Sequence, residues 1–331
     1  MNSSERIDNL LNGKPVDRKP VVPLIMRYAA KLIGKPYSEY CRDYRVLVSA
    51  DMKSWEILQY DMLSPISDAF REAYDFGEKV EFPYDGIPYC KDFLIKEHND
   101  ISKIKIPEPS SSERMLDRIK AVELFKEEVG DEVPILGWVE GAFAEACDLR
   151  GVQTAMMDVY DNPQFLFELL EIITKVEIEF AKEQIKAGAT FIGIGESVGS
   201  LVSAKTYREF ALPYMKRIIN EIHKMKAKAR LHICGNITHI LELIPETDVD
   251  IVDLDWMVSI KEAREKFGPD ICITGNFDPV AVLLEGTPDD IKRHIDEEEK
   301  EGADKYMICP GCEVPPDTPL ENMLAFCPGR Q

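Results

Sequence analysis

The sequence predicts an α/β protein, a single (β/α)8 barrel domain over residues 1–331 with a short N-terminal helical extension. Short apolar runs alternate with longer amphipathic patterns along most of the chain, as expected for parallel strands that helices cover on both faces. About eight such runs occur, and this chain length is ordinary for one barrel. No Gly-x-Gly-x-x-Gly or Walker A pattern follows any run, which argues against an open nucleotide-binding sheet.

The expected strands are short, apolar and bounded by turn residues. They cover residues 21–25, 59–63, 133–139, 190–194, 229–234, 250–255, 271–275 and 305–309. Helices are expected at 143–157, 163–187, 204–226, 236–244, 259–267 and 288–301. Asn162 and Pro163 are typical residues for a helix start, and Gly188 is typical of a helix end. Residues 64–112 break the alternation and predict a small β excursion with a loop, and the acidic run 297–302 predicts a solvated helix face.

Composition narrows the classes of function. The chain has 40 Lys and Arg against 60 Asp and Glu, a formal net charge of −20. Such a surface repels nucleic-acid phosphates and anionic membranes. No apolar run reaches the roughly 18–20 residues of a membrane-spanning helix, and the first residues lack the apolar core of a signal peptide. We therefore expect a cytoplasmic protein that binds neither nucleic acid nor membrane, with cysteines that serve as thiols or metal ligands rather than disulfides.

The residues LHICGN at 231–236 are the first sign of a functional site. Residues i and i+2 of a strand point to the same face, so His232 and Cys234 are expected to project together at the end of a strand. In a barrel, the active site lies at this carboxyl end of the strands. The spacing suits two ligands of one metal ion, although His-x-Cys alone is a weak signal.

Further candidate residues follow other expected strands. The Cys-Pro-Gly-Cys run brings Cys309 and Cys312 to the same rim, and Glu196 and Asp255 follow two other strands. Cys-x-x-Cys is also a redox motif, but here proline and glycine fill the gap and a turn-rich loop follows rather than a helix. An imidazole with thiolates is a soft donor set that suits zinc. Glu196 and Asp255 could instead have only structural roles, as carboxylates that cap a helix or bind loop amides.

Seven stretches together resemble the uroporphyrinogen decarboxylase superfamily along nearly the full length. They are LNGKPVDRKPVVPL near the start, GKPYSEY at 34–40, LVSAKTYREFALPYMKRI at 201–218, HICGN at 232–236, VDLDWMVSIKEAREKFG at 252–268, ITGNFDPVAVLLEGTPDDI at 273–291 and PGCEVPPDTPLENMLAF at 310–326. The resemblance implies a TIM-type barrel, in agreement with the strand pattern. It also implies one of two activities, decarboxylation of a tetrapyrrole or methyl transfer linked to a corrinoid.

The methyltransferase branch of this superfamily has a zinc motif His-x-Cys…Cys, which His232, Cys234 and Cys312 match. The resemblance favours Cys312 over Cys309, because the family's cysteine stands in Pro-Gly-Cys before a P-x-T-P-x-E-N segment. It implies a separate corrinoid (cobalamin) protein as partner, together with a small-molecule methyl donor or thiol acceptor. Glu196 is then expected either as a fourth, displaceable ligand or as a group that orients His232, and Asp255 is expected to serve similarly.

Two other residues resemble the decarboxylase branch. Arg27 stands in Met-Arg-Tyr-Ala-Ala-Lys, where the decarboxylases have a similar stretch with a second arginine that is Lys31 here. Asp68 stands in Ile-Ser-Asp-Ala-Phe, similar to a family motif. A metal-free decarboxylase is therefore the alternative, although a strongly acidic chain suits a substrate with up to eight carboxylates poorly. A non-catalytic protein that binds metal or corrinoid is the third hypothesis.

Overall fold

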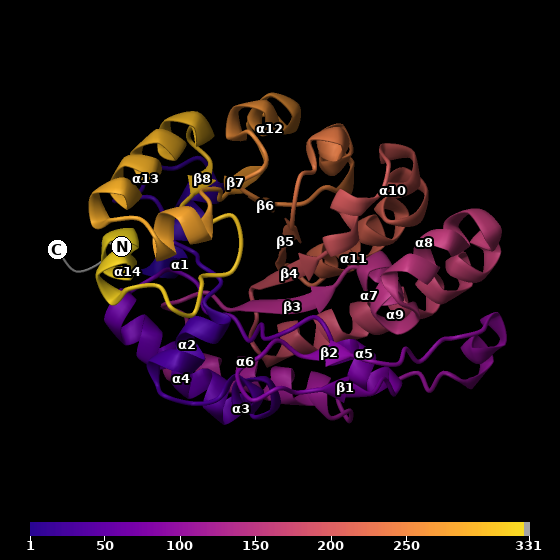
Figure 1. The fold of residues 1–331 in the computed structure, drawn as a ribbon. Helices are drawn as coiled ribbons and strands as arrows, with labels where there is room; N and C mark the ends of the chain where they lie inside the picture. The colour runs from indigo at the N-terminus through magenta and orange to yellow at the C-terminus, as the bar shows by residue number, and fades with distance from the viewer. Residues whose placement is uncertain (328–331) are drawn as a thin grey trace.

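A computed structural model of the chain describes residues 1–327. Within these residues, six parallel strands follow one another around the centre, each paired with the next in the sequence. They are Leu136–Glu140 (β3), Phe191–Gly195 (β4), Lys228–Ile233 (β5), Ile251–Leu254 (β6), Cys272–Thr274 (β7) and Tyr306–Met307 (β8). Helices surround the strands on the outside (Figure 1).

Two short extended segments close this sheet into a barrel. Val21 forms a parallel bridge with Ile308 just after β8, and Leu63 forms one with Ile135 just before β3. The two segments are joined by a 2.7 Å hydrogen bond from the Asp61 N–H to the Val21 carbonyl. Eight positions thus surround the axis in the described part of the chain, two of them too short to form regular strands. The predicted (β/α)8 barrel is confirmed.

The helices between the strands differ in detail from the prediction. The helix expected at 143–157 is two helices, Ala142–Arg150 (α7) and Val152–Asp161 (α8). The intervening Gly151 has a φ of +84°, a backbone conformation that breaks a right-handed helix and that glycine adopts readily. The apolar pattern continues across this position because α7 is buried almost all round and α8 follows it directly.

A second break divides the helix expected at 204–226 into Ala204–Phe210 (α10) and Leu212–Lys224 (α11). Pro213 stands in the first turn of α11. Proline has no N–H to donate and clashes with the carbonyl four residues earlier, so a continuous helix through this position is unfavourable. The helix expected at 236–244 is a 3-10 helix instead, Thr238–Thr247 (η3).

The long helix predicted at 163–187 is confirmed as α9, with Gly188 directly after it, although Asn162 makes no capping hydrogen bond with its side chain. The remaining helices are α1 (Ser3–Leu11), α2 (Met26–Leu32), α3 (Tyr37–Arg42), α4 (Tyr44–Leu58), α5 (Arg71–Phe76), η1 (His98–Lys103), α6 (Arg114–Val129), η2 (Ser197–Leu201), α12 (Ile260–Phe267), η4 (Pro279–Leu284), α13 (Pro288–Gly302) and α14 (Leu320–Phe326). No helix in residues 1–327 is long and apolar enough to cross a membrane.

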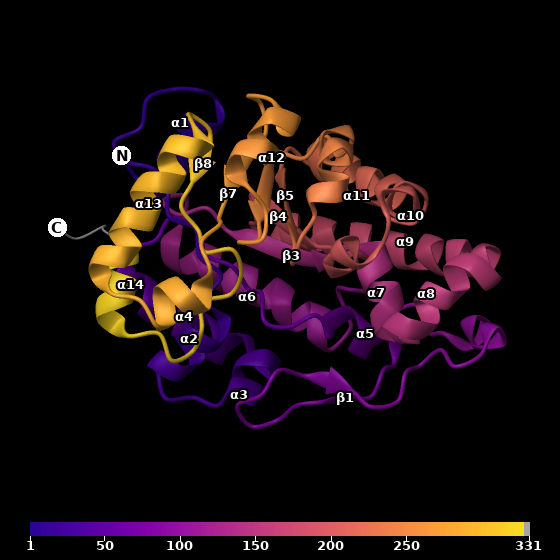
Figure 2. The same ribbon diagram turned by 45° about the horizontal axis from the view of Figure 1, so that its top comes forward.

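The predicted excursion is also present. Val80–Glu81 (β1) and Tyr89–Cys90 (β2) form a small antiparallel pair. The segment carrying β1 runs along the lower edge of the molecule in Figure 2, apart from the barrel strands. The acidic run 297–302 is largely solvated as predicted, except for Glu298 and Gly302, which are buried. The Glu298 carboxylate accepts a 2.8 Å hydrogen bond from the Tyr306 hydroxyl.

The strands separate two apolar cores, one inside the barrel and one between the strands and the helices. Leu136 and Trp138 of β3 belong to the inner core, as does Ile251 of β6. Because side chains alternate along a strand, every second residue faces the barrel interior. The inward series of β5 therefore contains Arg230 and His232, which places the candidate histidine inside the barrel near the carboxyl ends of the strands.

Candidate metal centre

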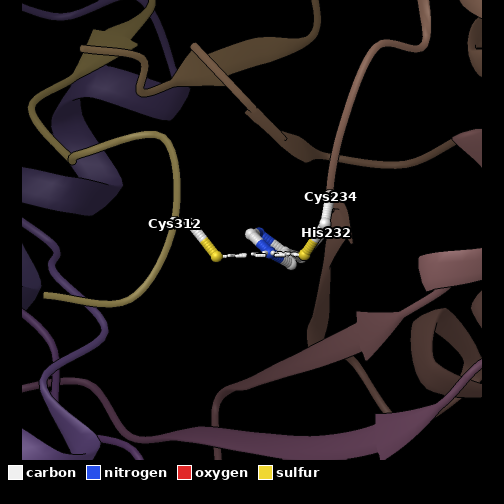
Figure 3. A group of neighbouring side chains, drawn as sticks. All are labelled: His232, Cys234 and Cys312. Atoms are coloured by element: carbon white, nitrogen blue, oxygen red, sulfur yellow. Dashed lines mark hydrogen bonds between the residues drawn. The ribbon is translucent and has the colours of Figure 1, made fainter. Parts of the chain in front are cut away.

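Three donor side chains meet at the mouth of the barrel. His232 is the last inward residue of β5, Cys234 follows two positions later, and Cys312 reaches in from the loop after β8 (Figure 3). One donor atom of each residue lies within 4.8 Å of the other two. The His232 Nε2 atom lies 3.1 Å from the Cys234 Sγ and 4.0 Å from the Cys312 Sγ, and the two sulfurs are 3.9 Å apart.

These distances suit a tetrahedral metal ion. Zinc lies about 2.3 Å from thiolate sulfur and about 2.0–2.1 Å from imidazole nitrogen. The corresponding edges of a tetrahedron are about 3.8 Å between two sulfurs and about 3.5 Å between nitrogen and sulfur. The observed separations lie within about half an ångström of these values. Three protein ligands would leave the fourth position open, the arrangement of catalytic rather than structural zinc sites.

The pKa shifts of the three groups also favour metal binding. Hydrogen bonds from Cys234 and His232 hold the pKa of the Cys312 thiol well below its usual range, and the pKa of Cys234 is raised because it shares the remaining proton. Burial lowers the pKa of His232, but the adjacent Cys234 sulfur and the Asp253 carboxylate raise it well above 6.5. The shifts favour a thiolate at Cys312, and a divalent cation held by the three groups would favour loss of their remaining protons.

Asp253 fixes the histidine ring. Its Oδ2 atom lies 3.2 Å from the His232 Nδ1, which leaves Nε2 directed toward the two cysteines. Asp253 also accepts a 2.7 Å hydrogen bond from Arg230 Nε and a 2.5 Å one from the Thr274 hydroxyl. Burial raises the pKa of Asp253, but Arg230 and His232 outweigh it and lower the pKa to about 2. Carboxylates in this position set the tautomer and orientation of metal-binding histidines.

The two cysteines of Cys-Pro-Gly-Cys have different surroundings. Cys312 belongs to the cluster, whereas Cys309 faces the inner core of the barrel and is buried. The Cys309 Sγ lies 3.6 Å from the Arg230 guanidinium. Burial raises the pKa of the Cys309 thiol to about 12. Of the two cysteines, only Cys312 lies beside His232 and Cys234.

The expected role of Glu196 needs correction. Its side chain does not reach the donor cluster, and the group that orients His232 is Asp253. The physical reason is strand alternation, since Gly195 faces the barrel interior and the next residue faces the helices. The Glu196 carboxylate lies against Gly141, at the start of α7, close to the N–H groups of Phe143 and Ala144 but without a hydrogen bond of good geometry. Burial raises its pKa to about 8.

Asp255 supports the loop that carries Cys234. Its two oxygens accept hydrogen bonds from the Gly235 N–H at 2.9 Å and from the Met257 N–H at 3.2 Å. Asp255 is not among the grouped donor atoms. Asp255 therefore holds the backbone of the loop, the simpler of the two roles considered for it from the sequence. It neither joins the donor cluster nor orients the His232 ring.

The structure places Arg27 near Cys312 but gives it a partner. Glu313, the residue after Cys312, accepts hydrogen bonds from the Arg27 backbone N–H at 3.0 Å and from its Nε at 3.1 Å. Arg27 also lines a hollow of about 450 Å³ with Lys31, Tyr37 and other residues. This pair fastens α2 to the loop that carries the third donor.

Asp68 is deeply buried and fully engaged. It lies 2.6 Å from the Arg114 Nη2 and accepts a 2.7 Å hydrogen bond from the Ser67 hydroxyl. Desolvation raises its pKa, but Arg114 and Arg71 outweigh burial and lower it. Its side chain has no exposed surface, so in this structure Asp68 is part of a buried ion pair rather than a group that faces a ligand.

Sequence reasoning assigned no site role to Asp253 and Arg230, which support the His232 ring, or to Glu140, which lies level with His232 two strands away. The signal for Asp253 was present, because the expected strands at 229–234 and 250–255 are neighbours and His232 pairs with Asp253 in the parallel register. Arg230 lies two positions before His232 on the same face. Glu140 gave no such signal, because its place depends on the register of two further strand pairs.

A barrel with convergent donors at the carboxyl ends of its strands is the architecture of an enzyme. The chain belongs to the uroporphyrinogen decarboxylase (URO-D) family, whose profile matches residues 2–328. One relative is a uroporphyrinogen decarboxylase of Geobacter metallireducens, 26% identical with 94% of each chain covered. Another is the methylcobamide:CoM methyltransferase MtbA of Methanosarcina acetivorans, 27% identical over 96% of this chain and 94% of the relative.

Solved structures support the fold. A methyltransferase from Methanosarcina mazei superimposes with a TM-score of 0.90 at 24% identity, covering 98% of this chain and 97% of that one. A B12-independent methionine synthase from Shewanella sp. W3-18-1 is more distant, with a TM-score of 0.59 at 14% identity and 86% of each chain covered. At these identities the likeness establishes the barrel architecture.

Proposed function

We propose that the chain is a zinc-dependent methyltransferase that moves a methyl group between a corrinoid on a partner protein and a small thiol or methylated substrate. The observation that carries this proposal is the convergence of His232, Cys234 and Cys312 into a half-open donor set with tetrahedral spacing. A metal-free decarboxylase would leave these three groups without a role. The methylcobamide:CoM methyltransferase among the relatives supports the same class of reaction.

The residues of the site have distinct tasks in this proposal. His232, Cys234 and Cys312 hold the metal, Asp253 keeps Nε2 of the histidine directed at it, and Asp255 holds the loop after Cys234. When bound, zinc supplies a Lewis acid that keeps a thiol deprotonated, or activates the heteroatom of a methyl donor. Transfer of a methyl group to a thiol is a displacement in which the thiolate is the nucleophile, and free thiols are mostly protonated at neutral pH.

The surface around the mouth suits a protein partner. Leu201 in η2, Trp256 and Met257 after β6, and Val280 in η4 are large apolar side chains that are exposed to solvent. All four stand on segments that follow strands, the side of the barrel on which Cys234 and Cys312 lie. We assign these four residues, the apolar rim, to the docking of the corrinoid protein, because exposed aromatic and Met side chains are enriched at interfaces.

Decarboxylation is the second candidate, since several relatives carry that name. It would require Arg27 and Asp68 to face the substrate. In the structure, Arg27 is paired with Glu313, and Asp68 with Arg114. Both residues thus already have internal partners, which favours the methyltransferase.

The first experiment is elemental analysis of zinc in the purified protein, beside the variants Cys312→Ser and Cys309→Ser. About one zinc per chain is expected in the wild type, as for a single catalytic site. The metal should be lost in Cys312→Ser and kept in Cys309→Ser, the matched control. A methylcobalamin assay with a panel of thiols then tests the transfer. Absence of zinc in protein prepared with zinc and reductant would refute the proposal and favour decarboxylation, which Arg27 and Asp68 variants would then test.

A further inference from the structure

Glu140 occupies the same level of the barrel as the metal-binding histidine. It is the last residue of β3, where it pairs with Gly195 of β4, and Gly195 in turn pairs with His232 of β5. Paired residues of adjacent parallel strands point to the same face. Glu140 and His232 therefore both face the barrel interior, and the only position between them is a glycine.

That glycine leaves room for the glutamate. A Cβ atom on Gly195 would lie 2.6 Å from the Glu140 Oε2 and 3.2 Å from the Trp138 Nε1. The Glu140 carboxylate thus leans across β4 toward β5, over the space that a side chain at residue 195 would fill. Adjacent strands are about 4.8 Å apart, so Oε2 lies about one strand spacing from the strand that carries His232.

The two oxygens of Glu140 are not equivalent. Oε1 accepts a 2.8 Å hydrogen bond from the Arg71 Nη2, and Arg71 is itself buried. Oε2 accepts no hydrogen bond from residues 1–327 in this structure. The Glu140 side chain is 7% exposed, so it is not completely sealed from solvent. One oxygen is anchored by Arg71 and the other leans over Gly195 toward the strand of His232, which suits a group that acts on a ligand.

We propose that Glu140 accepts the proton of the thiol substrate through its Oε2 atom. In this step the S–H bond breaks, the electron pair stays on sulfur, and an O–H bond forms on Glu140. The product is a thiolate beside a neutral carboxyl group, which returns its proton to solvent before the next turnover. This inference rests on the proposed methyltransferase function and adds a catalytic residue to it.

The charges around Glu140 suit this role. Burial and the nearby carboxylates of Glu72 and Asp148 raise its pKa well above 4.5, while Arg71 opposes them. The raised pKa brings the carboxyl group closer to the ordinary thiol pKa of about 8.5, so the proton transfer is less uphill than to an exposed glutamate. Arg71 keeps the carboxylate in place and limits how far its pKa rises.

The test counts protons rather than turnover. Protein with cobalt(II) in place of zinc is mixed with 2-mercaptoethanol in weak buffer, while a pH indicator reports protons released and the cobalt absorption reports thiol binding. The wild type should release about one proton fewer per bound thiol than Glu140→Gln, because the proton stays on the carboxylate. Glu145→Gln is the matched control, the same substitution at a buried carboxyl group on α7, and it should behave as wild type.

Gly195→Ala supplies an independent variant in case Glu140→Gln does not fold. It keeps the carboxylate but forces Oε2 from its place, so its proton release should match that of Glu140→Gln. Equal release from wild type and both folded variants, with a normal cobalt response to thiol, would overturn the role of Glu140 and leave the proposed function intact. A cobalt spectrum that thiol does not change in any protein would overturn thiol binding itself, and with it both proposals.

Discussion

Replacing Asp253 by asparagine is the sharpest test of how the site is supported. The substitution keeps the size of the side chain and removes its charge. Asp253 now accepts hydrogen bonds from Arg230 and Thr274 and contacts the His232 ring nitrogen. An amide cannot accept from all three, and it cannot balance the guanidinium. Arg230 is 1% exposed, so its charge would remain buried without a counter-ion.

The expected cost follows from that burial. Removing one partner of a buried ion pair costs about 3–5 kcal/mol, because the other charge is left uncompensated. Total stabilities of proteins are about 5–15 kcal/mol, so the loss is a large fraction of the whole. Loss of a carboxylate that orients a metal-binding histidine also weakens metal affinity by about 10- to 100-fold. Asp253→Asn should therefore lower both the free energy of unfolding and zinc affinity.

Urea unfolding followed by circular dichroism measures the first effect, and competition with a chromophoric chelator measures the second. Asp131→Asn is the control, since Asp131 is an exposed acid whose ion pair with Lys126 is screened by solvent and contributes little to stability. Adding Arg230→Met to Asp253→Asn removes the unpaired charge and should recover part of the lost stability. An Asp253→Asn protein within about 0.5 kcal/mol of wild type, with unchanged zinc affinity, would refute this account.

Three further predictions concern the barrel wall, a buried acid and the apolar rim. Gly193→Ala should destabilise the fold by about 1–3 kcal/mol, because the new Cβ atom would lie 2.2 Å from the Trp138 ring. Calorimetry should therefore show a lower melting temperature. An unchanged melting temperature would show that the ring moves aside freely. Burial raises the pKa of Glu298 in the folded state to about 8, whereas its pKa in the unfolded chain is about 4.5. Between pH 4.5 and 8 the folded state therefore holds a proton that the unfolded chain has released, and the free energy of unfolding should fall as the pH rises. Glu298→Gln should be more stable than wild type at pH 8 and similar at pH 4.5 in urea titrations, and a constant difference would contradict the assignment. Trp256→Ala should raise KM for the corrinoid protein about 30-fold, as for an interface residue that contributes about 2 kcal/mol to binding. The rate with free methylcobalamin should stay unchanged. Equal effects on both substrates would place Trp256 in the site itself.

The sequence by itself predicted the class of fold and the three candidate donors. Alternating apolar runs and amphipathic helices are local patterns, and each reports its own segment without knowledge of the rest. His232 and Cys234 share a strand end, so their common direction follows from local geometry alone. Cys312 required the family resemblance, because thiols at 309 and 312 are equivalent in sequence and differ only in which side of the loop faces the barrel mouth.

Only the tertiary structure decided what surrounds those donors. Glu196 directly follows the last inward residue of β4, and a difference of a single position turns a side chain to the opposite face. Glu140 lies two strands away from His232 and leans toward it over Gly195, which leaves space between them. Arg27 and Asp68 gained internal partners from segments distant in sequence. These outcomes depend on register and packing between remote segments, and the pattern of any one segment carries no information about either.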